Sequence, residues 1–104
     1  MFDNNSHCDT IKFIVMLKKR AIEQIVRSFA NHRRIQILDL IETTPELSVG
    51  EIADLLKVDI QLASIHIRKL LIAGLIMKRS QGKNIRHKLT KRGFFVLTFV
   101  RTLD

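Results

Sequence analysis

The residues with the clearest chemical potential are basic and lie close together in the second half of the chain. Residues 78–92 contain seven lysines and arginines and no acid. Residues 60–104 hold ten bases and one acid, whereas residues 1–59 hold eight bases and nine acids. With a net charge of +8, this imbalance indicates a polyanionic partner, nucleic acid first and an anionic membrane surface second. A basic surface that serves only solubility is the other interpretation.

Five of the seven bases in residues 78–92 fall in a predicted β-hairpin, which we call the wing. Residues 75–80 and 85–89 alternate apolar and polar side chains, and residues 81–84 between them form a glycine-containing turn. The wing residues expected to meet the polyanion are Lys78, Arg79, Lys83, Asn84, Arg86 and Lys88. His87, in the second strand, is expected to face phosphate or solvent.

The spacing of apolar residues predicts helices on both sides of the wing. They are expected at residues 9–30, 32–42, 48–56, 60–73 and 91–103. Suitable N-cap residues precede the last four: Asn31, Ser48, Asp59 and Thr90. Ser48 and Glu51 also have the spacing of a capping box, and Gly74 suits a helix C-terminus. Ile52, Ala53, Leu55 and Leu56 are expected to face inward from the short third helix.

Two short helices, a tight turn and a basic hairpin in succession predict a winged helix-turn-helix, a mainly α fold with a small β-hairpin. Residues 1–8 are predicted to form a flexible tail, and residues 9–104 a single domain. Within it, residues 48–89 are the helix-turn-helix with its wing. Residues 9–30 and 90–103 are predicted dimerisation helices.

Residues 60–73 form the predicted recognition helix, because the second helix of a helix-turn-helix enters the major groove of B-DNA. Helical spacing turns Ala63, Ile67 and Leu70 inward. The outward residues expected to meet DNA are Ile60, Gln61, Leu62, Ser64, Ile65, Arg68 and Lys69. His66, beside the inward stripe, is expected to be a structural histidine.

The outward residues differ in what they can recognise. Gln61 can bond adenine through two hydrogen bonds, and Arg68 can pair with guanine or a phosphate. Leu62 and Ile65 can contact only the methyl groups of thymine. With Ile60, these apolar residues can instead form a protein-binding face.

The aromatic residues favour duplex DNA over single strands. None of the six phenylalanines lies in residues 30–93, and modules for single strands and RNA stack bases on aromatic rings. The first and last helices are too apolar to be solvated in a monomer. Either they cover one another within one chain or, as we predict, they form a symmetric dimer. The predicted interface comprises Phe13, Ile14, Leu17, Ile25, Phe94, Phe95, Leu97 and Phe99.

Three segments carry a resemblance to a known family. Residues 32–38 (HRRIQIL), 46–53 (ELSVGEIA) and 67–76 (IRKLLIAGLI) resemble the ArsR-type winged-helix repressors. Residues 89–93 (LTKRG) are equally similar to MarR-like winged helices. The resemblance covers residues 28–90 and implies a dimeric transcriptional regulator.

Metal sensing does not carry over from that resemblance. Metal-sensing ArsR members carry cysteines in the segment that matches residues 46–52, where this chain has Ser48 and Gly50. The last helix offers no aspartate or histidine for the second metal site of that family. A soft-metal site needs thiolate or imidazole ligands at fixed spacing, so we expect neither a metal nor another cofactor.

Enzymatic activity and membrane insertion are not expected either. The chain has no glycine-rich phosphate loop, no paired nucleophile and histidine, and no paired carboxylates in a plausible cleft. A single cysteine excludes an internal disulfide. The apolar run at residues 13–17 is too short to span a membrane, so a cytoplasmic protein is expected.

The sequence thus predicts a homodimeric regulator that binds specific duplex DNA, most simply a repressor on a pseudo-palindromic operator. Two alternatives remain. A winged-helix interaction module would use the apolar outward residues of the recognition helix, and a basic DNA-binding protein without sequence preference would use only the phosphates. The sequence does not indicate an effector.

Overall fold

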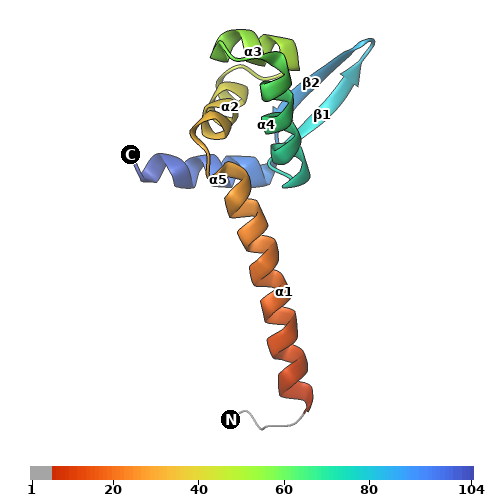
Figure 1. Cartoon of the computed structure of the whole chain (residues 1–104), viewed down its shortest axis with the longest axis vertical. Helices are drawn as coiled ribbons and strands as arrows, with labels where there is room; N and C mark the ends of the chain where they lie inside the picture. Colours follow the sequence, from red (N-terminus) through yellow and green to blue (C-terminus); the bar gives the residue numbers. More distant parts are fainter. Residues whose placement is uncertain (1–5) are drawn as a thin grey trace.

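Within residues 6–104 the chain folds into helices around one β-hairpin, in the order that the sequence predicts (Figure 1). A computed structural model describes the backbone of these residues and the side chains from residue 18 onward. The elements are α1 (Ser6–Phe29), α2 (His32–Thr43), α3 (Val49–Leu56), α4 (Ile60–Ile72), β1 (Ile76–Gln81), β2 (Asn84–Leu89) and α5 (Lys91–Thr102). α1 begins at Ser6, earlier than predicted, and it projects away from the body formed by the other elements.

The predicted N-caps of α2, α4 and α5 are confirmed. The Asn31 side chain accepts bonds from two amides of α2, at 2.9 and 3.2 Å. The Asp59 carboxylate accepts from the amide of Gln61 at 3.0 Å, and the Thr90 hydroxyl accepts from the amide of Gly93 at 3.1 Å. These bonds satisfy amide groups that have no partner inside a helix, and so fix where each helix begins.

The capping box of α3 is also confirmed. The Ser48 hydroxyl accepts from the amide of Glu51 at 3.2 Å, and the Glu51 carboxylate accepts from the amide of Ser48 at 2.9 Å. At its other end, α3 stops at Lys57, whose φ of 58° lies in the left-handed region. This one residue turns the chain sharply and allows α4 to begin three residues later, which is the tight turn of a helix-turn-helix.

The core lies where α2, α3, α4 and the base of the hairpin meet. Its fully buried large side chains are Ile37, Leu38, Ile41, Ile52, Leu70, Leu75 and Ile76. The prediction for α3 is wrong at Leu55, which is 56% exposed. α3 has only eight residues, so a narrow stripe through Ile52 and Ala53 is enough to seat it.

The wing is an antiparallel hairpin in which Ile76 pairs with Leu89 and Gln81 pairs with Asn84. Leu47 forms a β-bridge with His87 on the other edge of β2. The base of the wing is therefore bonded to the segment that precedes α3, which ties the wing to the helix-turn-helix.

α5 packs against the base of the wing, where the chain enters β1 and leaves β2. A Cβ atom at Gly93 would lie 2.0 Å from the carbonyl oxygen of Leu75, so only glycine allows this approach. At its far end, Arg101 contacts Asp39 and Glu42 of α2, with 3.0 Å between Arg101 and Glu42. Among the described residues, no helix is both long and apolar enough to cross a membrane.

Candidate nucleic-acid interface

α4 presents one continuous outward face. Its inward side chains are Ala63, His66, Ile67 and Leu70, all buried. Gln61, Ser64, Ile65 and Arg68 are exposed and lie at positions i, i+3, i+4 and i+7, so they share the opposite side of the helix. We call these four residues the reading face. Its centre, Ile65, is 53% exposed.

The other predicted residues of α4 lie beside the reading face. Ile60 and Leu62 are 50% and 42% exposed, and Lys69 is exposed. Ile60 leans toward α3, because its Cδ1 would lie 4.0 Å from a Cβ at Gly50. Ile60, Leu62 and Lys69 therefore flank the centre of the outward side.

A groove of about 500 Å³ separates α4 from the wing. Three of the residues that line it are cations: Arg68 from α4, Lys78 from β1 and Lys83 from the turn of the hairpin. Among the side chains that the structure describes, no acid lines this groove. Gly50, in the first turn of α3, lines it as well, and the first turn of a helix attracts anions through its amide groups. The groove is thus electrostatically suited to a phosphate backbone.

Five of the six predicted wing residues are exposed, among them Lys78, Lys83, Asn84 and Lys88, and the fifth is Arg79. Within the described part of the chain, the three lysines form no ion pair with an acid. Their ammonium groups are therefore available to an external anion.

The two wing arginines are directed toward protein instead. Arg86 donates to the backbone carbonyl of Glu46 and to the carboxylate of Glu51, both at 3.1 Å. Arg79 forms an ion pair of 3.0 Å with Glu46. Arg86 was expected to meet the polyanion, but in the structure its guanidinium holds the wing against Glu46 and α3. The sequence signal for this arrangement is weak, because Glu51 already has a partner in its capping box.

The pKa of Glu51 reflects both of its roles. Hydrogen bonds from the backbone amide and the hydroxyl of Ser48 lower the pKa of the Glu51 carboxyl group, and the positive charge of Arg86 lowers it further. Glu51 is therefore ionised at neutral pH and supplies a fixed negative charge at the base of the wing.

The expectation for His87 is wrong. His87 is 4% exposed, and its Nδ1 lies 2.9 Å from the carbonyl oxygen of Leu47. The β-bridge between these two residues covers this edge of β2, so the imidazole faces the interior.

His66 is a buried structural histidine, as predicted. Its Nδ1 lies 3.3 Å from a guanidinium nitrogen of Arg34, at the start of α2. Burial lowers the pKa of His66, and the charges of Arg34 and Lys69 lower it further. A neutral His66 can accept the hydrogen bond from Arg34, so this pair ties α2 to the middle of α4. Sequence reasoning missed Arg34, which lies 32 residues from His66.

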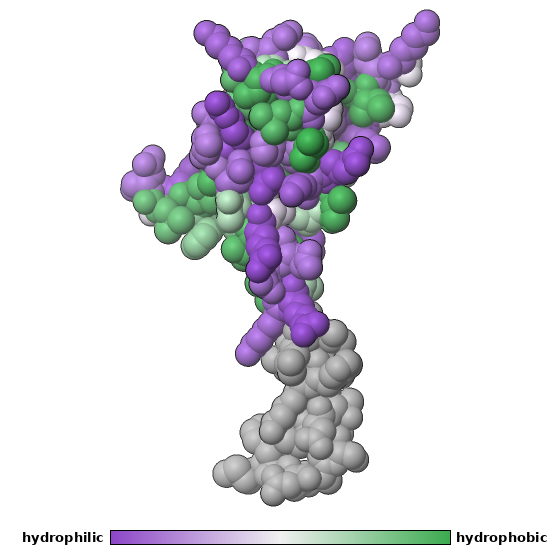
Figure 2. Space-filling view, in the orientation of Figure 1, coloured by the Kyte–Doolittle hydropathy of each residue, from purple (hydrophilic) through white to green (hydrophobic). Residues whose placement is uncertain are grey.

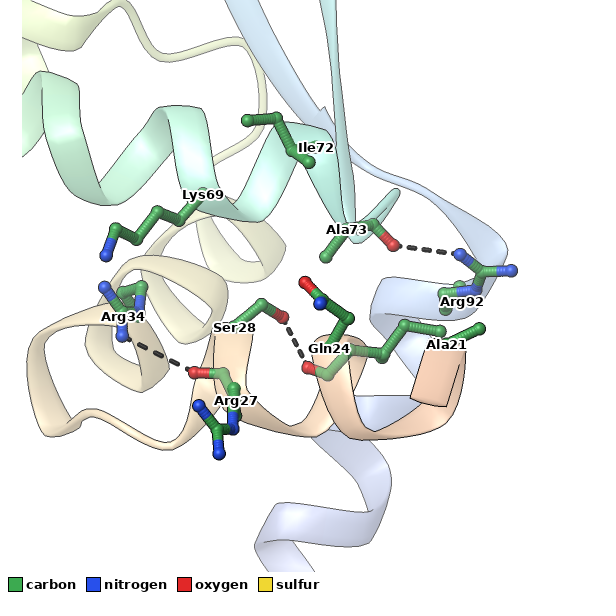
Figure 3. Close-up of a pocket in the computed structure, with 10 residues that line it drawn as sticks. Ala21, Gln24, Arg27, Ser28, Arg34, Lys69, Ile72, Ala73 and Arg92 are labelled. Carbon is green, nitrogen blue, oxygen red and sulfur yellow. Dashed lines mark hydrogen bonds between the residues drawn. The ribbon is translucent and has the colours of Figure 1, made fainter. Parts of the chain in front are cut away.

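A second cavity, of about 600 Å³, lies between α1, the start of α2, the end of α4 and the start of α5 (Figure 3). Its basic side chains are Arg27, Arg34, Lys69 and Arg92. Arg92 donates to the carbonyl oxygen of Ala73 at 2.9 Å. Because four elements build this cavity, no local pattern in the sequence indicates it.

The predicted dimer residues fall into four groups. Phe94, Phe95 and Phe99 are 51%, 69% and 54% exposed, and Figure 2 shows apolar surface along α5. Ile25 is partly buried against the core. Leu97 is 2% exposed and belongs to the core of the chain itself, so its placement at an interface is wrong. Its neighbours Phe95 and Phe99 project from the other side of α5. The remaining predicted residues have side chains outside the described part: Phe13, Ile14 and Leu17.

Nothing in the described part of the chain suggests a metal site. No group of three histidine, cysteine, aspartate or glutamate side chains lies close enough together there to hold an ion.

Solved structures with the same fold are regulators. The chain aligns with a crystal structure of a possible transcriptional regulatory protein from Mycobacterium bovis at a TM-score of 0.72 and 25% identity, over 81% of this chain and 90% of that one. An NMR structure of an M. bovis homodimeric winged helix-turn-helix DNA-binding domain, possibly of the ArsR family, aligns with a TM-score of 0.76 and 21% identity, over 99% of this chain and 89% of that one. The transcriptional regulator HlyU from Vibrio vulnificus aligns with a TM-score of 0.68 and 25% identity, over 90% of this chain and 97% of that one.

The sequence comparison gives the family itself. No curated protein sequence matches the chain. The family model described as the MarR family matches residues 30–88, which run from the start of α2 through most of the wing and include the reading face and the groove. The winged helix-turn-helix fold and this match agree, and the chain belongs to the MarR family.

Proposed function

We propose that this protein is a homodimeric transcriptional regulator that binds specific duplex DNA, most simply a repressor on a pseudo-palindromic operator. One observation carries the proposal. The exposed reading face of α4 lies beside a groove with three cations and no acid. A helix that reads base edges needs flanking cations that hold the phosphates, and this arrangement supplies both.

On this proposal the two parts of the interface have different roles. Gln61, Ser64 and Arg68 meet base edges in a major groove, because their side chains can donate to or accept from bases. Lys78, Lys83 and Lys88 hold phosphates of the flanking backbone. Phosphate contacts carry no sequence information, so specificity resides in α4 and affinity largely in the wing.

We propose that a second copy of the chain covers the exposed phenylalanines of α5 in a dimer. Phe94, Phe95 and Phe99 are all more than half exposed on one helix, and adjacent exposed apolar residues mark interaction surfaces. The M. bovis domain of the same fold is homodimeric, which supports this reading. Two-fold symmetry would place the two α4 helices in successive major grooves, about one helical turn apart.

Selection of binding sites from random duplex DNA tests the proposal. We expect an inverted repeat with half-sites about 10 base pairs apart. Gln61→Ala should relax the preference at one position in each half-site, whereas Gln36→Ala, at an exposed glutamine of α2, should leave it unchanged. Steeply salt-dependent binding to every duplex, without an enriched site, would contradict sequence-specific regulation and favour a protein that binds DNA only through phosphates.

The apolar residues of the helix-turn-helix favour one other function. Leu55, Ile60 and Leu62 are half-exposed, so this region can also serve as a protein-binding face. Absence of duplex binding even at low salt would favour this interaction module over a DNA-binding regulator.

A further inference from the structure

The centre of the reading face is apolar, although the other three residues of this face are polar. Ile65 is 53% exposed and lies among Gln61, Ser64 and Arg68 on the same side of α4. A β-branched aliphatic side chain at this position cannot donate or accept a hydrogen bond. Its exposed surface can therefore contribute to binding only through contact with an apolar group.

Unmodified B-DNA offers one such partner in its major groove. The C5-methyl group of thymine is the apolar group among base edges that are otherwise donors and acceptors. We propose that Ile65 is a specificity-determining residue that reads the methyl group of a thymine in each half-site. This inference rests on the proposed function and names the base that the middle of the reading face selects.

Helix geometry places that thymine relative to its neighbours. Ile65 lies four residues after Gln61, which is about 6 Å along the helix axis at 1.5 Å per residue. Successive bases on one strand lie about 3.4 Å apart, so the thymine should fall within about two base pairs of the base that Gln61 contacts. Arg68, three residues further, would meet the next base or phosphate.

The surroundings of Ile65 favour DNA over a protein as its occupant. Cores of protein interfaces are depleted of lysine, whereas Lys78 and Lys83 line the groove that adjoins the reading face. No acid lines that groove among the residues whose side chains the structure describes. A protein partner would have to bury these cations or match them with acids, whereas a duplex neutralises them with its phosphates.

The experiment removes the methyl group alone. Each thymine of the selected operator is replaced in turn by deoxyuridine, which pairs identically but lacks the methyl group. The dissociation constant of the full-length protein is measured at fixed salt by fluorescence anisotropy. Burial of one methyl group is worth about 0.8 kcal/mol, so we expect one thymine in each half-site at which the replacement weakens binding about fourfold.

Two variants assign the effect to a side chain. Ile65→Ala should bind the thymine and deoxyuridine operators equally well. Ile72→Ala is the matched control, because Ile72 is 79% exposed on the same side of α4 but lies two turns further from its N-terminus. This control should keep the fourfold difference. Both positions are exposed, and circular dichroism verifies that both variants fold.

The outcomes separate this inference from the proposed function. Tight binding to the selected operator with no sensitivity to deoxyuridine would overturn the role of Ile65 and leave the regulator intact. A sensitivity that persists in Ile65→Ala would overturn it as well, since another residue then reads the methyl group. Failure to select any operator would overturn both the inference and the proposed function.

Discussion

Replacing Lys83 with alanine removes a cation from the exposed tip of the wing, where it lines the groove beside α4. Each phosphate contact contributes about 0.9 to the slope of log K against log salt concentration. A dimer would carry two copies of Lys83, so the slope should fall by about 1.8. Between about 50 and 200 mM salt, the wild-type protein should therefore lose about twelvefold more affinity than the variant.

Fluorescence anisotropy at several salt concentrations, on the selected operator and on an unrelated duplex, measures this slope. Lys83→Ala should weaken binding to both duplexes alike, because phosphates do not report sequence. Lys18→Ala is the matched control, since Lys18 is an exposed lysine on α1, which projects away from the wing (Figure 1). Its slope should match that of the wild-type protein.

Arg86→Ala provides a second comparison for Lys83→Ala within the wing. Arg86 carries the same charge as Lys83, but it is bonded to Glu46 and Glu51. Its loss should change the slope much less and should instead lower the free energy of unfolding by about 1.5–3 kcal/mol, the contribution of one hydrogen bond from a charged group to a backbone carbonyl. If Lys83→Ala altered sequence preference while the slope stayed constant, the assignment of the wing to phosphates would be wrong.

Four further substitutions test the packing, the electrostatics and the dimer. Gly93→Ala should lower the midpoint of thermal unfolding by several degrees, because the new Cβ would lie 2.0 Å from a backbone oxygen; an unchanged midpoint would contradict that contact. Burial lowers the pKa of His66 below its ordinary 6.5, so this residue contributes stability that is fully present above pH 6.5 and is lost as the pH falls toward its folded pKa. Urea unfolding between pH 7.5 and 5.5 should show this loss in the wild-type protein and a smaller loss in His66→Gln. Leu97→Ala should destabilise each subunit by about 2–5 kcal/mol, whereas Phe95→Ser should leave subunit folding intact and shift the sedimentation profile toward monomer.

Local signals in the sequence predict most of the fold. N-caps such as Asn31 and Asp59, and the capping box of Ser48, depend on residues within one helical turn of each other, so a reading of neighbouring residues is sufficient. The reading face follows from the same principle, because the spacing of Ala63, Ile67 and Leu70 determines which side of α4 is buried.

The predictions for Arg86, His87 and Leu97 are wrong because these residues depend on contacts with distant parts of the chain. The directions of Arg86 and His87 depend on the segment around Leu47, which is 40 residues away in the sequence. The alternation of side chains along β2 predicts which residues share a face of the hairpin. It does not predict that the segment around Leu47 covers the outer edge of β2. For Leu97, an apolar helix such as α5 has more than one apolar side, and only tertiary packing selects the side that enters the core.

The bonds of Arg86 also bear on the entropy of binding. A mobile hairpin would have to be ordered on DNA, and each immobilised long side chain costs about 0.5–1.5 kcal/mol. Because Glu51, the capping residue of α3, also holds Arg86, the base of the wing is already oriented relative to the helix-turn-helix before any duplex arrives. The entropic cost of ordering the wing on DNA is thereby limited to the tip around Lys83. The rest of the wing already has its bound orientation in the free protein.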